Sequence, residues 1–265
     1  MEIKRHLSII VSVLFGAMFL NACKKDNLDS RSTTLPVIES YLMVGQPISV
    51  KLYLQKDLTD TATYGSPITG QTLYLSDGTQ QYHLTETAKG TYTYADQSIL
   101  ATGKKYTLQF DYNGYTVSAT TTMPAKPQNF ASQYTGITIS GDSGPGSQET
   151  VLNVFTWSNP DSLNHVLAFE GTGTMIQVNR FATGHPINVQ LNTNRASQYN
   201  ITARTLSYLG NYQAILFSVN QEYINLMSTS TRTTSQSLTQ VPTNIVNGFG
   251  IFTAMQADTL SFATH

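Results

Sequence analysis

Cysteine and charged residues are scarce in this sequence. Cys23 is the only cysteine among 265 residues. No disulfide can therefore form within the chain, and a folded domain must be stabilised by packing and hydrogen bonds. Charged side chains make up 12% of the residues, which is about half the share usual in soluble domains. The polar surface must instead come from Ser, Thr, Asn, Gln and Tyr, a composition that suits extracellular β-proteins.

A surplus of positive charge is also missing. Fifteen Lys and Arg residues oppose sixteen Asp and Glu residues, giving a formal net charge of -1. The last lysine is Lys126, so the second half of the chain carries only scattered arginines. Nucleic-acid binding needs a basic surface patch, and the sequence offers none. We therefore expect no nucleic-acid partner.

The first twenty residues have the pattern of an export signal. Lys4 and Arg5 precede an apolar segment over residues 7–20. This segment is too short to cross a bilayer comfortably, which argues against a retained transmembrane helix. We expect residues 1–22 to be a cleaved signal peptide.

The residues that end this segment indicate lipidation. Leu20, Asn21 and Ala22 directly precede Cys23 and resemble a lipobox. Small residues before the cysteine let the lipoprotein signal peptidase reach the bond once the thiol carries lipid. We expect Cys23 to be the lipidated first residue of the mature protein and residues 23–34 to form a flexible tether. The alternative is an ordinary signal peptide with an incidental cysteine.

The charged residues after Cys23 indicate the membrane to which the protein is sorted. Residue 24 is Lys rather than Asp, which by resemblance to the known sorting rule favours the outer membrane. Lys24, Lys25 and Asp26 also resemble the export signal of Bacteroidota surface lipoproteins. We therefore expect a lipid-anchored protein that faces the cell exterior. The alternative is that this run is only a solvated tether.

Residues 35–124 have the pattern of an immunoglobulin-like β-sandwich. Short apolar segments alternate with turn signals about every eight to twelve residues. Residues 48–54 alternate between apolar and polar side chains, as in a half-buried strand. The Asx-Gly pairs at 77–78 and 113–114 predict hairpins with type I′ turns. Segments 70–73, 90–92 and 103–108 resemble the prealbumin-like modules that are appended to carboxypeptidases and cell-surface proteins.

Aromatic residues at strand spacing allow two interpretations. They could stack sugars on an open face, but tyrosines at such spacing are more often half-buried packing residues. The residues concerned are Tyr92, Tyr94, Tyr106, Tyr112 and Tyr115.

Residues 127–265 predict a second β-rich domain, with a stiff linker at 124–127. Segments 203–208 and 212–219 are expected to pair around 209–211, and Trp157 is expected in the core. The fold class expected for the whole is mainly β, with two sandwich-like domains.

One short helix is expected in this second domain. Asn220 suits an N-cap, and the helix should run from Gln221 to about Thr231, with Tyr223, Leu226 and Met227 on one face. The glycines on either side of Phe249 predict close backbone approach or a bulge.

The sequence contains only weak matches to known catalytic motifs. Residues 141–145 resemble the nucleophile loop of trypsin-like proteases, but His83 is the only upstream histidine of the mature chain and no matching context surrounds it. His165 follows Asp161 by four residues, which indicates a surface hydrogen bond rather than a ligand pair. Glycosidase chemistry needs two acids that converge; Glu149, Asp161, Glu170 and Glu222 are candidates, and sequence spacing alone does not bring any two of them together.

Motifs for metal ions are missing as well. The sequence has no His-x-x-x-His, no pair of cysteines and no Asp-rich calcium loop. We expect no catalytic residue, metal or cofactor.

Several features together resemble the Bacteroidota lipoprotein family catalogued as domain of unknown function 4249. They are the lipobox, an immunoglobulin-like module closed by residues 122–124, the helix with Tyr223 and the tail over 244–252. The resemblance covers nearly the whole mature chain and implies a class and a location, without catalytic residues. Such proteins tend to be encoded beside outer-membrane TonB-dependent transporters, which implies a role in envelope transport.

The leading hypothesis is a non-enzymatic accessory or binding partner of a TonB-dependent transport system. Its expected partners are the membrane, an outer-membrane β-barrel transporter and a glycan or peptide ligand. An autonomous adhesin or glycan-binding module is the alternative, favoured if exposed aromatic rings line one continuous face. An enzyme would be favoured by acids that converge in a cleft.

Overall fold

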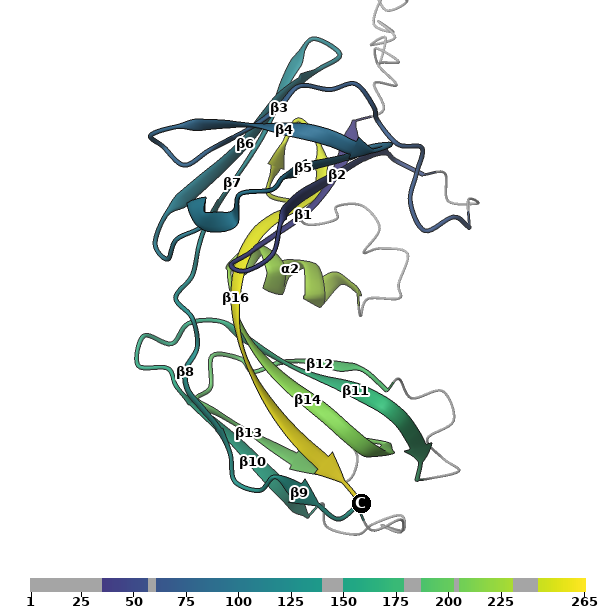
Figure 1. Ribbon diagram of the computed structural model, residues 1–265, viewed down its shortest axis with the longest axis vertical. Helices are drawn as coiled ribbons and strands as arrows, with labels where there is room; N and C mark the ends of the chain where they lie inside the picture. The colour runs from purple at the N-terminus through teal and green to yellow at the C-terminus, as the bar shows by residue number, and fades with distance from the viewer. Residues whose placement is uncertain (1–34, 57–60, 140–149, 179–186, 203–204, 231–242) are drawn as a thin grey trace, which may run out of the picture. The chain divides into compact units, whose positions relative to one another are not determined.

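The computed structural model describes residues 35–56, 61–139, 150–178, 187–202, 205–230 and 243–265 (Figure 1). The predicted signal peptide, lipobox and tether all lie outside these residues. The described chain is mainly β, with two sandwich-like arrangements of strands and one α-helix, as the sequence predicts.

Seven strands and a short 3-10 helix build most of the first sandwich. In β1 and β2 buried and partly exposed side chains alternate, because one face of each strand lies on the core. The elements are β1 (Pro36–Met43), β2 (Ile48–Leu54), β3 (Leu73–Ser76), β4 (Gln81–Ala88), β5 (Thr91–Tyr94), η2 (Gln97–Ile99), β6 (Lys105–Tyr112) and β7 (Tyr115–Thr122).

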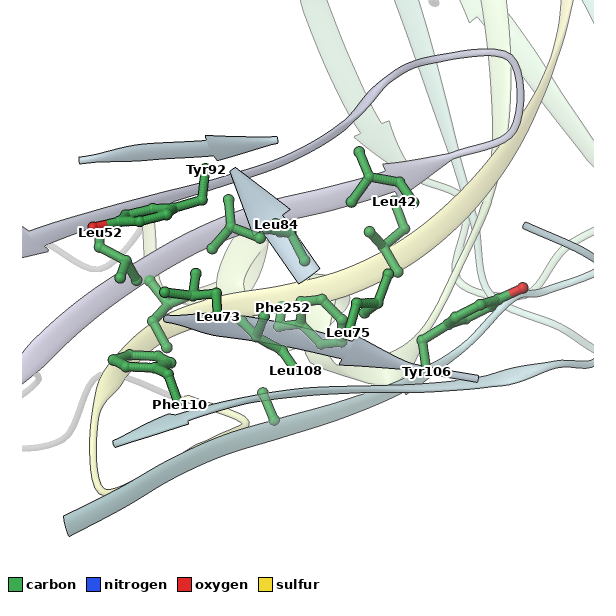
Figure 2. Close-up of a cluster of buried hydrophobic side chains, with 14 of the residues drawn as sticks. Leu42, Leu52, Leu73, Leu75, Leu84, Tyr92, Tyr106, Leu108, Phe110 and Phe252 are labelled. Carbon is green, nitrogen blue, oxygen red and sulfur yellow. The ribbon is translucent and has the colours of Figure 1, made fainter. Parts of the chain in front are cut away.

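Two sheets enclose the first core. Strand β4 pairs with β5 in one sheet and with β3 in the other, and so connects them. Leucines from both sheets meet in the interior together with Tyr92, Tyr106, Phe110 and Phe252 (Figure 2). Burial of these apolar side chains is the main stabilising term in a chain without disulfides among its described residues.

The two predicted hairpins form, but their turns differ. Asn113 and Gly114 both have positive φ, 50° and 82°, and Tyr112 pairs with Tyr115, as a type I′ turn requires. At the other hairpin Ser76 pairs with Gln81, so the loop has four residues and only Gly78 has positive φ. The type I′ prediction was therefore wrong at this site. The Asp77 carboxylate instead accepts hydrogen bonds from the loop backbone.

The second sandwich has its own aromatic core. Phe155, Phe169 and Phe262 pack edge to face with ring centroids 5.5–5.8 Å apart, and Trp157 is buried beside them, as predicted. Its strands are β8 (Gln128–Ser132), β9 (Gly136–Ile137), β10 (Val151–Ser158), β11 (His165–Gln177), β12 (Val189–Asn192), β13 (Gln198–Thr202), β14 (Tyr208–Val219) and the second half of β16 (Phe249–Thr264).

The hairpin predicted around residues 209–211 does not form. Strand β14 runs without interruption through these residues and pairs with β11 and β16. Strand β13 ends at Thr202 and pairs with β10 in the opposite sheet. The prediction was wrong because Leu209-Gly210-Asn211 has turn-like composition, whereas Gly210 here takes φ 142° inside a long strand.

Strand β16 belongs to both sandwiches. Its first half pairs in parallel with β1, and its second half pairs antiparallel with β14. Phe252 and Ala254 of β16 lie in the first core, as does Ile245 of β15 (Ile245–Val246). The expected second domain, 127–265, contained all of these residues, whereas the structure places them in the first sandwich. They cover an edge and a core that residues 35–124 alone would leave open.

A glycine permits this parallel pairing. Gly250 has φ 95°, and a Cβ at this position would collide with the carbonyl oxygen of Ile38 on β1. The expected close backbone approach next to Phe249 is therefore confirmed.

Helix α2 (Gln221–Ser230) forms where the sequence predicts it. Tyr223 and Met227 of the predicted face pack, with Ile224 and with Tyr41 and Met43 of β1, against a small apolar cluster of Val166, Val219 and Met255. Leu226, the third residue predicted on this face, does not belong to that cluster. Asn220 stands at the N-cap position and its carbonyl oxygen accepts from the amide of Tyr223. Its side-chain amide, however, donates to Thr121, Thr122 and Ala254, so this residue joins the helix to strands β7 and β16.

Candidate functional site

The tyrosine stripe of the first sandwich is not an open platform. Tyr92 and Tyr106 are fully buried, and their hydroxyls donate to the carbonyl oxygens of Ile68 (3.0 Å) and Ile99 (2.7 Å). The remaining three stripe residues are Tyr94 and Tyr112, which pack against the same core, and Tyr115, which is exposed. Four of these five rings therefore serve packing.

His165 is buried rather than part of a surface pair. Its side chain is 2% exposed, its Nδ1 lies 3.2 Å from the carbonyl oxygen of Leu163, and its Nε2 lies 3.2 Å from the hydroxyl of Ser218. Burial lowers the pKa of this imidazole. The expected hydrogen bond with Asp161 was wrong, because β11 begins at His165 and turns its ring into the sandwich.

The other candidate acids and histidine are scattered. Glu170 is exposed on β11, Glu222 lies on α2, and Asp161 is exposed in a loop. His83 lies beside the ring of Tyr74, with centroids 5.6 Å apart. Glu149 and the loop over 141–145 fall outside the described residues.

Asp77 has a structural role that sequence reasoning missed. Its carboxylate accepts hydrogen bonds from Thr79, Gln80 and Tyr82 and forms a 2.8 Å ion pair with Lys104 of the neighbouring loop. Lys104 and these donors hold the pKa of Asp77 well below its usual range. Both carboxylate oxygen atoms of Asp77 are occupied by the turn and by Lys104, so they are not available to bind a ligand.

A polar groove lies between helix α2 and the start of β16. Its volume is about 250 Å³. Most of the lining side chains carry amide, hydroxyl or carboxylate groups. The residues that line the groove are Gln221, Glu222, Asn225, Thr243, Asn244, Gly250 and Ile251. Such groups can fix the orientation of a ligand through hydrogen bonds.

Glu222 is held at the wall of this groove by one of its two oxygen atoms. Oε1 accepts from the hydroxyls of Thr121 (2.8 Å) and Thr253 (3.1 Å). The Thr121 hydroxyl itself accepts from the amide of Ala254 (3.1 Å). Oε2 has no hydrogen-bond partner within the described part of the chain. The two threonines thus fix the rotamer of Glu222, and its Oε2 atom remains without a hydrogen bond from the described residues.

Side chains bond the backbone of β16 along its edge beside the groove. Asn244 bonds both backbone groups of Phe252, and Thr121 and Asn220 bond those of Ala254. These bonds hold the groove wall in place.

A second set of groups lies on the outer face of β1 and β2. We call it the tyrosine face and define it as Glu39, Tyr41, Lys51, Tyr53 and Tyr64. Glu39 lies directly opposite Lys51 in the antiparallel pair. Lys51 nevertheless donates to the Tyr64 hydroxyl (2.9 Å), with its Nζ 4.5 Å from the centroid of that ring.

The rings of the tyrosine face meet edge to face. Tyr53 and Tyr64 lie 5.2 Å apart at 63°, and Tyr41 meets Tyr223 of α2 at 6.2 Å and 81°. Burial, together with the Glu39 charge, raises the pKa of Tyr53 to about 12 and raises that of Tyr41 further. Both phenols are therefore neutral near neutral pH.

The groove and the tyrosine face adjoin. Glu39 pairs in register with Ile251, which lines the groove, and Tyr41 pairs with Thr253, which bonds Glu222. Neighbouring strands are about 4.8 Å apart, so the two sets of groups form one continuous surface beside α2. We treat this surface as the candidate site.

Sequence reasoning missed this surface. The alternation in residues 36–43 could have placed Glu39 and Tyr41 on one outward face. Glu222 was among the acids considered, but its neighbours depend on the parallel pairing of β1 with β16.

Metal ligands do not gather in the described ranges: no group of three His, Cys, Asp or Glu side chains there could hold an ion. In the same ranges, no α-helix is both long and apolar enough to cross a bilayer.

Comparison with known proteins defines the family of the chain. The family model described as "Domain of unknown function (DUF4249)" matches residues 25–261. The chain therefore belongs to the DUF4249 family, as the sequence features indicate. No curated protein matches the sequence.

A solved structure of chicken CNTN1 FN1-FN3 domains is similar to 87% of this chain, with 12% identity and a TM-score of 0.29. The chain spans 64% of the length of that structure.

Proposed function

We propose that the protein is a lipoprotein anchored in the outer membrane through Cys23 and facing the cell exterior, where it is a non-enzymatic binding accessory of a TonB-dependent transporter. The observation that carries the proposal is the continuous surface beside α2. It presents carboxylates, amides and tyrosine rings, and the second carboxylate oxygen of Glu222, Oε2, accepts no hydrogen bond from the described residues. Exposed polar groups next to aromatic rings are typical of binding surfaces.

The candidate catalytic groups are occupied by contacts within the fold, which supports binding rather than catalysis. His165 is buried, with its ring nitrogens within hydrogen-bond distance of the Leu163 carbonyl oxygen and the Ser218 hydroxyl, and the Asp77 carboxylate is occupied by its turn and by Lys104. A general base must reach a substrate proton, which neither group can do from its position.

The lipid anchor supports an accessory role. Each buried methylene of an acyl chain contributes about 0.8 kcal/mol to membrane binding, so several chains anchor a protein firmly. A protein confined to a membrane meets an integral neighbour at high effective concentration. A modest surface such as the groove can then be occupied without tight affinity in solution.

Site-specific photo-crosslinking in intact cells tests the proposal. A photoreactive p-benzoylphenylalanine would replace Asn225, an exposed residue of the groove, and in a control strain Gln109, an exposed residue of β6 in the other sheet. We expect position 225 to give a product with an outer-membrane β-barrel transporter, and position 109 to give much less.

Two outcomes would contradict the proposal. Equal yields from both positions would contradict the assignment of the binding site to the surface beside α2. Products that contain only glycan, with no barrel protein, would replace the accessory role by that of a glycan-binding surface module.

A further inference from the structure

Strand β1 is the first described strand after Cys23, the residue proposed to carry the lipid. It pairs in parallel with β16 over seven residue pairs, from Val37 with Phe249 to Met43 with Met255. The chain therefore enters this ladder at the N-terminal end of β1 and leaves it at the C-terminal end of β16. Because the two strands run in the same direction, a pull on these two ends acts along the strands and in opposite senses.

The direction of a pull decides how many pairs resist it. A pull along the strands loads all pairs of the ladder together, whereas a pull across them breaks the pairs one after another. A single hydrogen bond contributes little to stability, so resistance depends on how many bonds must break at once. Unfolding under force is governed by the barrier to unfolding, and simultaneous rupture raises that barrier.

The ladder between β1 and β16 is shielded from water. Ile38 and Leu42 of β1 and Phe252 and Ala254 of β16 lie in the first core. Thr253, which points to the opposite face and bonds Glu222 of α2, is also fully buried. Hydrogen bonds in such surroundings are stronger than in water. Water therefore cannot replace one of these bonds until the strands have separated.

Just beyond the ladder, β16 is fastened to the segment that joins the two sandwiches. The side-chain amide of Gln256 donates to the hydroxyl of Thr102 (2.7 Å) and to the carbonyl oxygen of Pro124 (2.6 Å). Asp258 forms a 3.0 Å ion pair with Lys126. A load on β16 is thus shared with this segment and with β14, whereas β1 alone receives the load on the side of Cys23.

The groove lies on the far side of the ladder from Cys23. Helix α2, which lines the groove, directly follows β14, and β14 pairs with β16 from Gly210 to Val219. Since Val219 pairs with Met255 at the C-terminal end of the ladder, a partner held at α2 pulls from that end. The lipid anchor pulls from the opposite end.

We propose that the β1–β16 ladder is a mechanical clamp, which keeps the protein folded while it is held between its membrane anchor and a bound partner. The proposal rests on the proposed function, because the lipid at Cys23 and the partner are the two ends of the load. Parallel pairing of the anchored strand with the strand shared by both sandwiches is the feature that creates the clamp.

Optical tweezers test the clamp on the mature chain, residues 23–265, produced without lipid. The thiol of Cys23, the only cysteine, takes one DNA handle. For a pull along the strands, the second handle is attached to a cysteine added after His265. For a pull across them, it is attached to Gln109→Cys, an exposed position on β6.

Gln109 lies level with the start of the ladder. It pairs with Ser118 of β7. On either side of Ser118, the carbonyl oxygen of Thr116 accepts from Asn247, and the hydroxyl of Thr121 accepts from the amide of Ala254. At equal loading rate we expect the pull along the strands to need about twofold more force or greater, because the pairs break together.

A pair of glycine variants assigns the resistance to the ladder. Gly250→Ala places a methyl group against the carbonyl oxygen of Ile38 and should lower the force along the strands by about half. Gly103→Ala adds the same group at φ 78°, where no atom lies within 4 Å, and should leave the force unchanged. Circular dichroism checks that both variants fold. If Gly250→Ala does not fold, the two pulling directions on the parent sequence decide the question.

The clamp is refuted by equal forces in the two directions, by a lower force along the strands, or by a folded Gly250→Ala with the force of the parent. These measurements need neither membrane nor partner, so their failure leaves the proposed function to the crosslinking experiment. If the clamp is found and crosslinking from position 225 gives no barrel, the transport role is wrong and the clamp remains a property of the fold.

Discussion

Replacement of Phe252 by Ala tests whether the C-terminal strand is part of the first sandwich. Phe252 lies on β16, yet its ring is fully buried among leucines of the first core (Figure 2). Truncation of a buried Phe to Ala costs about 3 to 5 kcal/mol, because transfer energy is lost and a cavity remains. This is a large share of the roughly 5 to 15 kcal/mol by which domains are stable.

Urea denaturation measures this cost. With a slope of about 3 kcal/mol per molar, the midpoint should fall by about 1 M or more. Thr259→Ala, at an exposed position of the same strand, should change the free energy of unfolding by less than about 0.5 kcal/mol. A cost below about 1 kcal/mol for Phe252→Ala would refute the packing argument.

Hydrogen exchange locates the effect. Phe252→Ala should weaken protection of the amides in β2 and β6, which enclose the first core, more than that in β10. Phe262→Ala, in the second core, should give the opposite pattern. If Phe252→Ala instead weakens only the second sandwich, the assignment of β16 to both cores is wrong.

Three further predictions concern single residues. Cys23→Ser should abolish lipidation and move the protein out of the detergent phase in a partitioning assay; membrane association of that variant without a transporter would contradict the anchor. The free energy of unfolding should fall as pH drops below about 6.5, by at most about 1.4 kcal/mol per pH unit, because the unfolded chain protonates His165 more readily than the folded one. His165→Gln should flatten this dependence in urea titrations and His83→Gln should not; equal slopes in both would refute the assignment. Asp77→Asn should lower the melting temperature at pH 7 and make it less sensitive to acid below about pH 4, where the native carboxylate loses its advantage over the unfolded one; a melting curve like that of the parent would contradict the role of the turn.

Local patterns predicted much of the fold. The alternation in residues 48–54, the Asn113-Gly114 turn and the helix after Asn220 all follow from short-range rules, and the structure confirms them. Each depends on neighbours within a few residues, which a single sequence displays.

Long-range pairing could not be predicted in the same way. Strand β16 meets β1 across about 200 residues of chain, and no local pattern encodes which edge a strand will join. The candidate site depends on this pairing, because it brings Glu39 beside Ile251 and Tyr41 beside Thr253. Sequence reasoning therefore found the helix with Glu222 but not the surface to which it belongs.

The buried state of His165 was missed for a related reason. A histidine after a turn is usually exposed, and only the pairing of β11 with β14 places its ring against Ser218. The same holds for Asp77, whose partner Lys104 lies on a different hairpin.

The dependence of crosslinking on the anchor tests the central claim most directly. The yield of the product between position 225 and the outer-membrane barrel would be compared in cells that export equal amounts of the parent protein and of Cys23→Ser. We predict that the parent gives a strong product and that Cys23→Ser loses most of it, because release from the membrane removes the high effective concentration. An undiminished yield from Cys23→Ser, or no barrel product from the lipidated parent, would contradict the account of a membrane-anchored transport accessory.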